Sequence, residues 1–184
     1  MDVTNPKPLW LLDVDGVLNV GRRANGRPPH VWPADAWVDF TGHDAPSGSD
    51  WPMRVARPVV DFINSVIDDD LVDVAWLTTW RDSANALGAT LGLPPLDVVP
   101  TPDFDRRHVM KDWWKLPPAR DFLGGRPLVW TDDDASYYLR DDDKVNFNAW
   151  PNLVVSPSTS TGLVKRHLTT IHDHLTLVRD KLRA

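Results

Sequence analysis

The sequence has no cysteine among its 184 residues. It therefore contains neither a disulfide framework nor a thiolate metal site. No hydrophobic run approaches the length of about 20 residues that a membrane-spanning helix needs. The N-terminal residues also lack the charged and apolar regions of a signal peptide. We therefore expect a cytoplasmic protein that has no contact with a membrane.

Positive charge is also scarce, with 20 Lys and Arg against 26 Asp and Glu and a net charge of −6. This balance argues against a broad nucleic-acid-binding surface, although a local one is compatible with it. Tryptophan, in contrast, is abundant, with ten residues. Some must lie in the core, and others are available for the rim of a binding site. The length suits one domain, residues 1–184, with a sizeable core.

Apolar runs and helical periodicity alternate along the chain. Strands are expected at residues 8–14, 71–78, 96–99, 127–131 and 153–155. Helices are expected at residues 58–69, 82–91, 109–123 and 135–140, and from a cap at Thr161 to the C-terminus. This alternation predicts a doubly wound, Rossmann-like α/β fold in which helices cover both faces of a five-stranded parallel sheet. The last helix has a continuous apolar seam, which either packs on the sheet or forms a dimer interface. We favour the first, and a monomer.

Residues 20–56 differ from the rest of the chain because prolines, glycines and three tryptophans interrupt any regular pattern. The segment is too aromatic for a flexible linker and too broken for a long helix. We expect an ordered loop or a small hairpin that acts as a flap, because long loops in compact domains are usually functional. The segment is too short for a full cap domain.

The chain is organised around residues 10–19 (WLLDVDGVLN), in which an apolar run ends in two acids and a glycine. Side chains alternate along a strand, so Asp13 and Asp15 are expected on the same side of it. Gly16 allows the chain to turn sharply where the strand ends. Two carboxylates placed so close together repel each other and are poorly solvated. A bound divalent cation would remove that cost.

Other polar residues follow the second and fourth expected strands. Thr78 and Thr79 follow one, and Asp132 and Asp133 follow the other. Parallel sheets place their sites at the carboxyl ends of the strands, so these residues should converge with Asp13. Three or four converging carboxylates indicate Mg²⁺, which prefers oxygen ligands and is commonly completed by a substrate phosphate.

These residue types fit phosphoryl transfer. A carboxylate can attack phosphorus to give an aspartyl phosphate, which water then cleaves. An acid two residues further on can protonate the leaving oxygen and later activate water. A hydroxyl such as that of Thr78 and a lysine, either Lys111 or Lys115, are the expected partners of the phosphate oxygens.

Residues 13–19 (DVDGVLN) resemble the first motif of the haloacid-dehalogenase-like (HAD) phosphatases. Thr78 after residues 74–77 resembles the second motif, a lysine before the fourth strand the third, and residues 131–133 (TDD) the fourth. The motifs follow the order of the family along the chain. The resemblance implies that Asp13 is the nucleophile and a metal ligand. It also implies that Asp15 is the general acid and base and lends its backbone carbonyl to the metal.

The same resemblance assigns the other site residues. Asp133, helped by Asp132, would complete the metal shell. Thr78, Thr79 and Gly16 would bind the phosphate, together with Lys115 or Lys111. Lys115 fits the pattern of the subgroup described next, whereas Lys111 has the spacing to the fourth motif that is more usual in the wider superfamily. We prefer Lys115.

A closer resemblance involves residues 77–80 (LTTW), 91–94 (LGLP), 126–130 (RPLVW) and 161–163 (TGL). These segments are similar to the HAD domain of Swiss Army Knife RNA-repair proteins. The resemblance implies a Mg²⁺-dependent phosphomonoesterase that acts on a phosphorylated substrate such as a nucleic-acid end. One alternative is a small-metabolite or nucleotide phosphatase with the same mechanism. Another is a non-catalytic protein that binds a metal or a phosphorylated partner.

Overall fold

A short apolar strand, β1 (Leu9–Leu12), lies at the centre of a five-stranded sheet, and all its residues are buried. The computed structural model describes residues 7–21, 26–45, 47–101 and 113–183. The sheet is parallel throughout, with the strand order β5-β4-β1-β6-β7. Its other strands are β4 (Asp73–Trp76), β5 (Asp97–Val98), β6 (Leu128–Thr131) and β7 (Leu153–Val155). This confirms the predicted five-stranded parallel sheet.

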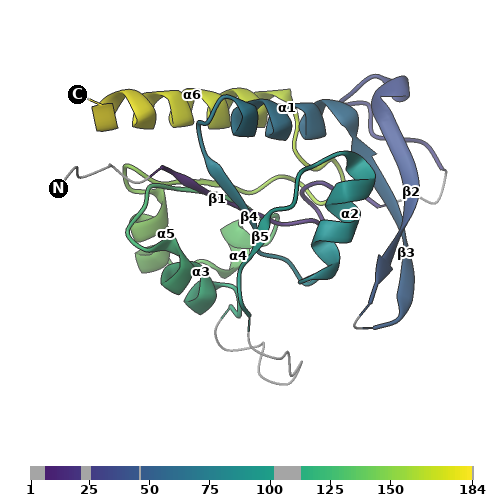
Figure 1. The fold of residues 1–184 in the computed structure, drawn as a ribbon, viewed down its shortest axis with the longest axis horizontal. Coiled ribbons are helices and arrows are strands. Elements are labelled where there is room, and N and C mark those ends of the chain that lie inside the picture. Colours follow the sequence, from purple (N-terminus) through teal and green to yellow (C-terminus); the bar gives the residue numbers. More distant parts are fainter. Residues whose placement is uncertain (1–6, 22–25, 46, 102–112, 184) are drawn as a thin grey trace.

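Helices cover both faces of the sheet (Figure 1). They are α1 (Arg57–Asp68), α2 (Ser83–Leu91), α3 (Leu116–Leu123), α4 (Ala135–Tyr138), α5 (Asp141–Asn148) and α6 (Lys165–Arg183). Trp10 and Leu12 belong to the core that β1 shares with α1, α2 and α6. Leu9 and Leu11 belong to the opposite core, beside α3, α4 and α5. Alternate residues of β1 thus face two different helix layers, which is the doubly wound arrangement.

The segment between β1 and α1 forms a two-stranded antiparallel hairpin, so the hairpin alternative for residues 20–56 is correct. A 3₁₀ turn (Ala34–Ala36) precedes strands β2 (Trp37–Asp44) and β3 (Ser49–Ala56). Met53 and Val55 of β3 are fully buried in the core that contains α1. The hairpin is therefore anchored on the sheet domain, and Figure 1 shows it beyond α2.

The apolar seam of α6 packs inside the chain, as predicted. Leu168, Ile171 and Leu175 belong to the same buried cluster as α1 and the sheet. The seam is therefore used for packing on the sheet. Within the described part of the chain, no helix combines the length and the hydrophobicity needed to cross a membrane.

Two predicted helix starts are wrong. α3 begins at Leu116, and its prolines occupy the first turn, where the missing N–H groups cost nothing; they do not interrupt a longer helix. Residues 109–112 of the expected helix lie outside the described part. α6 begins at Lys165, because Thr161 lies in a turn and donates its hydroxyl to the carbonyl of Ser158.

An acidic run at residues 141–143 lies at the start of a helix that was not among those expected. It begins the helix α5, and Asp143 is buried and ion-paired with Arg120 of α3. This pair joins α3 and α5 on one face of the sheet.

Candidate phosphate and metal site

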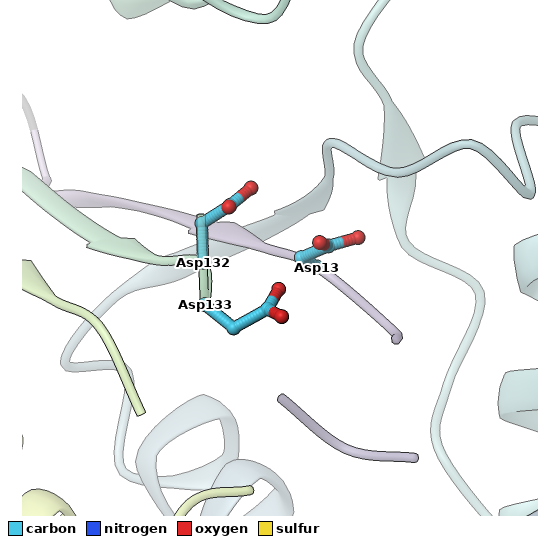
Figure 2. Close-up of side chains that lie close together, drawn as sticks. All are labelled: Asp13, Asp132 and Asp133. Carbon is cyan, nitrogen blue, oxygen red and sulfur yellow. The ribbon is translucent and has the colours of Figure 1, made fainter. Parts of the chain in front are cut away.

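Three aspartates meet at the carboxyl ends of the neighbouring strands β1 and β6. Asp13 directly follows β1, and Asp132 and Asp133 directly follow β6. Each offers a carboxylate oxygen that lies within 4.8 Å of those of the other two (Figure 2). The parallel pairing of β1 with β6 explains this, because Leu12 is opposite Thr131 and both strands end at the same level. The predicted convergence of these three residues is confirmed.

Lys115 lies between two of these carboxylates. Its Nζ is 2.6 Å from Asp13 Oδ2 and 2.5 Å from Asp132 Oδ2. The lysine immediately precedes α3 and is 5% exposed. It therefore reaches the sheet edge from the helix layer that contains α3, α4 and α5. Lys111, the other candidate lysine, lies outside the described residues. Lys115 is thus a candidate lysine that contacts two of the three clustered aspartates.

The two buried carboxylates have fixed orientations. Asp13 Oδ1 accepts a hydrogen bond of 2.8 Å from the backbone N–H of Val14, and its other oxygen faces Lys115. Asp132 Oδ1 accepts one of 3.0 Å from the backbone N–H of Asp134, which starts the turn into α4. Each carboxylate therefore has one oxygen on the backbone and the other on the lysine.

Charge and burial together perturb the titration of this group. Burial and the negative charge of Asp13 raise the pKa of Asp132 to about 7, although Lys115 opposes them. Burial alone would lower the pKa of Lys115, but the two carboxylates outweigh it and raise that pKa. Burial also raises the pKa of Asp133, against the hydrogen bond from Thr159. Three carboxylates against one ammonium leave a charge of −2 when all are ionised.

This donor set fits a hard divalent cation. Carboxylate oxygens are the ligands that Mg²⁺ prefers, and the chain has no thiol that would select a softer metal. A divalent cation would also balance the residual charge of −2. Asp13, Asp132 and Asp133 are therefore the residues that would hold the ion.

Asp15 does not join this cluster. β1 ends at Leu12, so the alternation of a strand no longer applies two residues later. The exposed Asp15 carboxylate instead accepts hydrogen bonds from Asn19 Nδ2 at 2.8 Å and from Trp80 Nε1 at 2.9 Å. Its backbone carbonyl was the part assigned to the metal by resemblance, and that assignment stays a prediction.

The two threonines after β4 differ in their surroundings. β4 pairs with β1, and the N–H of Leu77 bonds to the carbonyl of Leu12, which places Thr78 beside the end of β1. Thr78 is 2% exposed, and its hydroxyl accepts a weak 3.4 Å bond from the N–H of Trp80. Thr79 is exposed. Thr78 is therefore the better placed of the two for contact with a bound phosphate.

One functional contact escaped the sequence reasoning. The hydroxyl of Thr159 donates a 2.9 Å hydrogen bond to Asp133 Oδ2 and so orients that carboxylate. Thr159 follows β7, whose carboxyl end lies at the same sheet edge as those of β1 and β6. Collecting polar residues after the fifth expected strand as well would have found it.

No protein-family model matches the chain, and no curated protein matches it. The resemblance to the HAD phosphatases therefore depends on the motifs and on how the fold arranges them.

Gly16 lies against the metal-site residue Asp133. It has a φ of +73°, and a Cβ built on it would lie 2.2 Å from Asp133 Oδ2. We predict that Gly16→Ala displaces the Asp133 carboxylate and weakens Mg²⁺ binding at least about tenfold. The positive φ adds a loss of about 1–2 kcal/mol in the free energy of unfolding. Titration calorimetry and thermal denaturation measure the two effects.

Gly125→Ala is the matched control for this substitution. Gly125 has a φ of +77°, but nothing lies within 4 Å of its added Cβ. The control should lose similar stability and keep its Mg²⁺ affinity. Equal Mg²⁺ affinities for the two variants would contradict the role given to Gly16.

The raised pKa of Asp132 makes metal binding dependent on pH. Below pH 7 most of the metal-free protein carries a proton on this carboxyl, and the ion must displace it. We predict that Mg²⁺ binds about tenfold more weakly at pH 6 than at pH 8. Calorimetry in buffers of different ionisation enthalpy measures both the affinity and the proton release. In Asp132→Asn this dependence should become shallower; an unchanged profile would show that another group titrates.

Proposed function

We propose that this protein is a Mg²⁺-dependent phosphomonoesterase that acts through an aspartyl phosphate on Asp13. The observation that carries the proposal is the position of Lys115, whose side chain is buried and pairs with both Asp13 and Asp132. A simple metal-binding site gains nothing from a buried ammonium among its ligands. A site for a phosphoryl group does, because the transferring oxygens carry negative charge in the transition state.

The residues divide the chemistry between them. Asp13 uses a carboxylate oxygen to attack phosphorus, and the bond from phosphorus to the leaving oxygen breaks. Asp15 gives its proton to that oxygen and then takes one from water. The water oxygen attacks the phosphorus, the bond to Asp13 breaks, and phosphate leaves. A bound Mg²⁺ would neutralise charge on the phosphoryl oxygens.

The remaining residues hold the reacting groups. Lys115 fixes the Asp13 carboxylate and is close enough to a phosphoryl group on that residue to balance its charge. Thr78 is buried at the end of the neighbouring strand and provides a hydroxyl donor. Asp132 keeps Lys115 charged, and Thr159 orients Asp133.

A phosphate-release screen with Mg²⁺ tests the proposal. It compares 5′- and 3′-phosphorylated oligonucleotides with mononucleotides, sugar phosphates and an aryl phosphate. We expect release that stops when a chelator removes the metal. Preference for oligonucleotide ends would support a nucleic-acid substrate, whereas preference for mononucleotides would remove it. The absence of release from every substrate would overturn the phosphatase proposal.

A further inference from the structure

The Asp15 carboxylate is held by two side chains that no motif of the resemblance assigned to it. Trp80 Nε1 donates to its Oδ2 at 2.9 Å, and Asn19 Nδ2 donates to its Oδ1 at 2.8 Å. One bond comes from the turn after β4 and the other from the loop after β1. Two donors from different elements fix the plane of a carboxylate that would otherwise rotate freely at an exposed position.

Both donors are in turn fixed by the hairpin β2–β3. Asn19 is buried, and its Oδ1 accepts the backbone N–H of Arg54 in β3 at 3.0 Å and that of Gly21 at 3.1 Å. The carbonyl of Arg54 also accepts the N–H of Val20 at 3.1 Å. The amide of Asn19 therefore connects β3 to Asp15 through one side chain.

The indole of Trp80 is held by the opposite strand of the hairpin. A Cβ built on Gly42 of β2 would lie 2.9 Å from Trp80 Cη2 and 3.1 Å from Met53 Cγ. Trp80 is 4% exposed, so its ring lies packed beneath the hairpin while its N–H reaches Asp15. The N–H of Ala45 also bonds to Ser83 Oγ at 3.1 Å, which joins the end of β2 to α2.

We propose that Trp80 and Asn19 are positioning residues that hold the Asp15 carboxylate for proton transfer, and that the hairpin β2–β3 fixes both of them. This inference rests on the proposed phosphatase activity. Proton transfer to the leaving oxygen matters most when that oxygen is a poor leaving group. The ratio kcat/KM reports the formation of the aspartyl phosphate and not its hydrolysis, in which Asp15 also acts. A positioning role therefore acts on kcat/KM for an alkyl phosphate and much less on kcat/KM for p-nitrophenyl phosphate, whose leaving group needs little help.

The test compares these two substrates in Trp80→Phe, which keeps an aromatic ring and removes the indole N–H. We expect kcat/KM for glycerol phosphate to fall at least about tenfold. The value of kcat/KM for p-nitrophenyl phosphate should change less than about threefold. Asn19→Asp keeps the oxygen that accepts from Arg54 and replaces the donor to Asp15 with a carboxylate oxygen, which repels Asp15 and displaces it. It should change the ratio of the two kcat/KM values in the same direction.

Trp76→Phe is the matched control. Trp76 is also buried, and its indole Nε1 donates to a side-chain oxygen, Asn85 Oδ1, at 3.1 Å. The control loses the same atoms and a similar bond, so both variants should lose stability, but the ratio of kcat/KM values should change only in Trp80→Phe. If Trp80→Phe does not fold, Asn19→Asp alone decides the question.

The role of the hairpin is tested by adding a methyl group at Gly42. Gly42→Ala presses on the outer ring of Trp80, and we expect the same change in the ratio. In Trp80→Phe that outer ring is missing, so Gly42→Ala should then have little further effect. Equal effects in both backgrounds would overturn the role of the hairpin.

The outcomes separate this inference from the proposed function. An active wild-type protein whose variants keep the wild-type ratio of kcat/KM values would overturn the positioning role and leave the phosphatase proposal intact. A wild-type protein that hydrolyses neither substrate with Mg²⁺ would overturn both.

Discussion

Asp13→Asn is expected to lower the rate of p-nitrophenyl phosphate hydrolysis at least about a thousandfold. The amide has nearly the shape of the carboxylate but lacks the charge and the nucleophilic oxygen. The chain should stay folded, because Lys115 keeps its pair with Asp132 and the buried site loses one of three negative charges. Steady-state phosphate release at saturating Mg²⁺, with circular dichroism as a check of folding, measures both effects.

Asp61→Asn is the control for that experiment. Asp61 is exposed on α1, far along the chain from the aspartate cluster, and the same chemical change there should leave the rate unchanged.

Acid-quenched wild-type protein should carry the phosphoryl group on the peptide that contains Asp13. A variant at position 13 that retains wild-type turnover would refute the aspartyl-phosphate mechanism, whatever the fold.

The fold could be predicted because its signals are local and repeated. Each buried strand is a short apolar run, and each helix carries an apolar stripe, so their alternation indicates a parallel sheet. That sheet then brings Asp13, Asp132 and Asp133 together, since all three directly follow the paired strands β1 and β6. The charged centre of the site therefore followed from topology alone.

Other parts of the site depend on where elements begin and end. The apolar run suggested a strand through residue 14, but pairing stops at Leu12, and Asp15 turns toward Asn19 and Trp80. Lys115 reaches Asp13 and Asp132 from its position just before α3, and the prolines in the first turn of that helix define where it starts. A periodic pattern marks the middle of an element much better than its ends.

Contacts between loops were the least predictable. Thr159 meets Asp133, and Gly42 meets Trp80, across long stretches of chain and without any shared periodicity. Gly16 was predicted as a turn residue, but its fit against Asp133 needs the position of both loops. Such contacts follow from the packing of the complete fold, and single-sequence patterns do not contain that information.

Lys115→Met is expected to lose both activity and stability, and the dependence of the stability loss on pH and Mg²⁺ distinguishes its cause. Without the ammonium, Asp13 and the fully buried Asp132 face each other with no opposite charge between them. Removing one partner of a buried ion pair costs about 3 kcal/mol, and we expect that loss in the free energy of unfolding at pH 8. Urea denaturation in the absence of metal measures it.

The loss should be smaller at pH 6 than at pH 8. The pKa of Asp132 is already raised to about 7, and removing the lysine takes away the charge that opposes this shift. At pH 6 the carboxyl is therefore protonated in the folded variant, and its repulsion with Asp13 disappears. Mg²⁺ should also stabilise the variant at pH 8, because the cation replaces the missing positive charge.

Activity should not return with stability. The variant is expected to stay at least about a hundredfold below the wild-type rate at saturating Mg²⁺, because the ion does not replace a donor directed at the phosphoryl oxygens. Lys115→Met combined with Asp132→Asn should regain most of the stability and none of the activity, whereas Lys181→Met, at an exposed position on α6, should change neither. If Lys115→Met were as stable as the wild type at pH 8 and equally active, the ammonium would have no part in the site, and the observation that carries the phosphatase proposal would be lost.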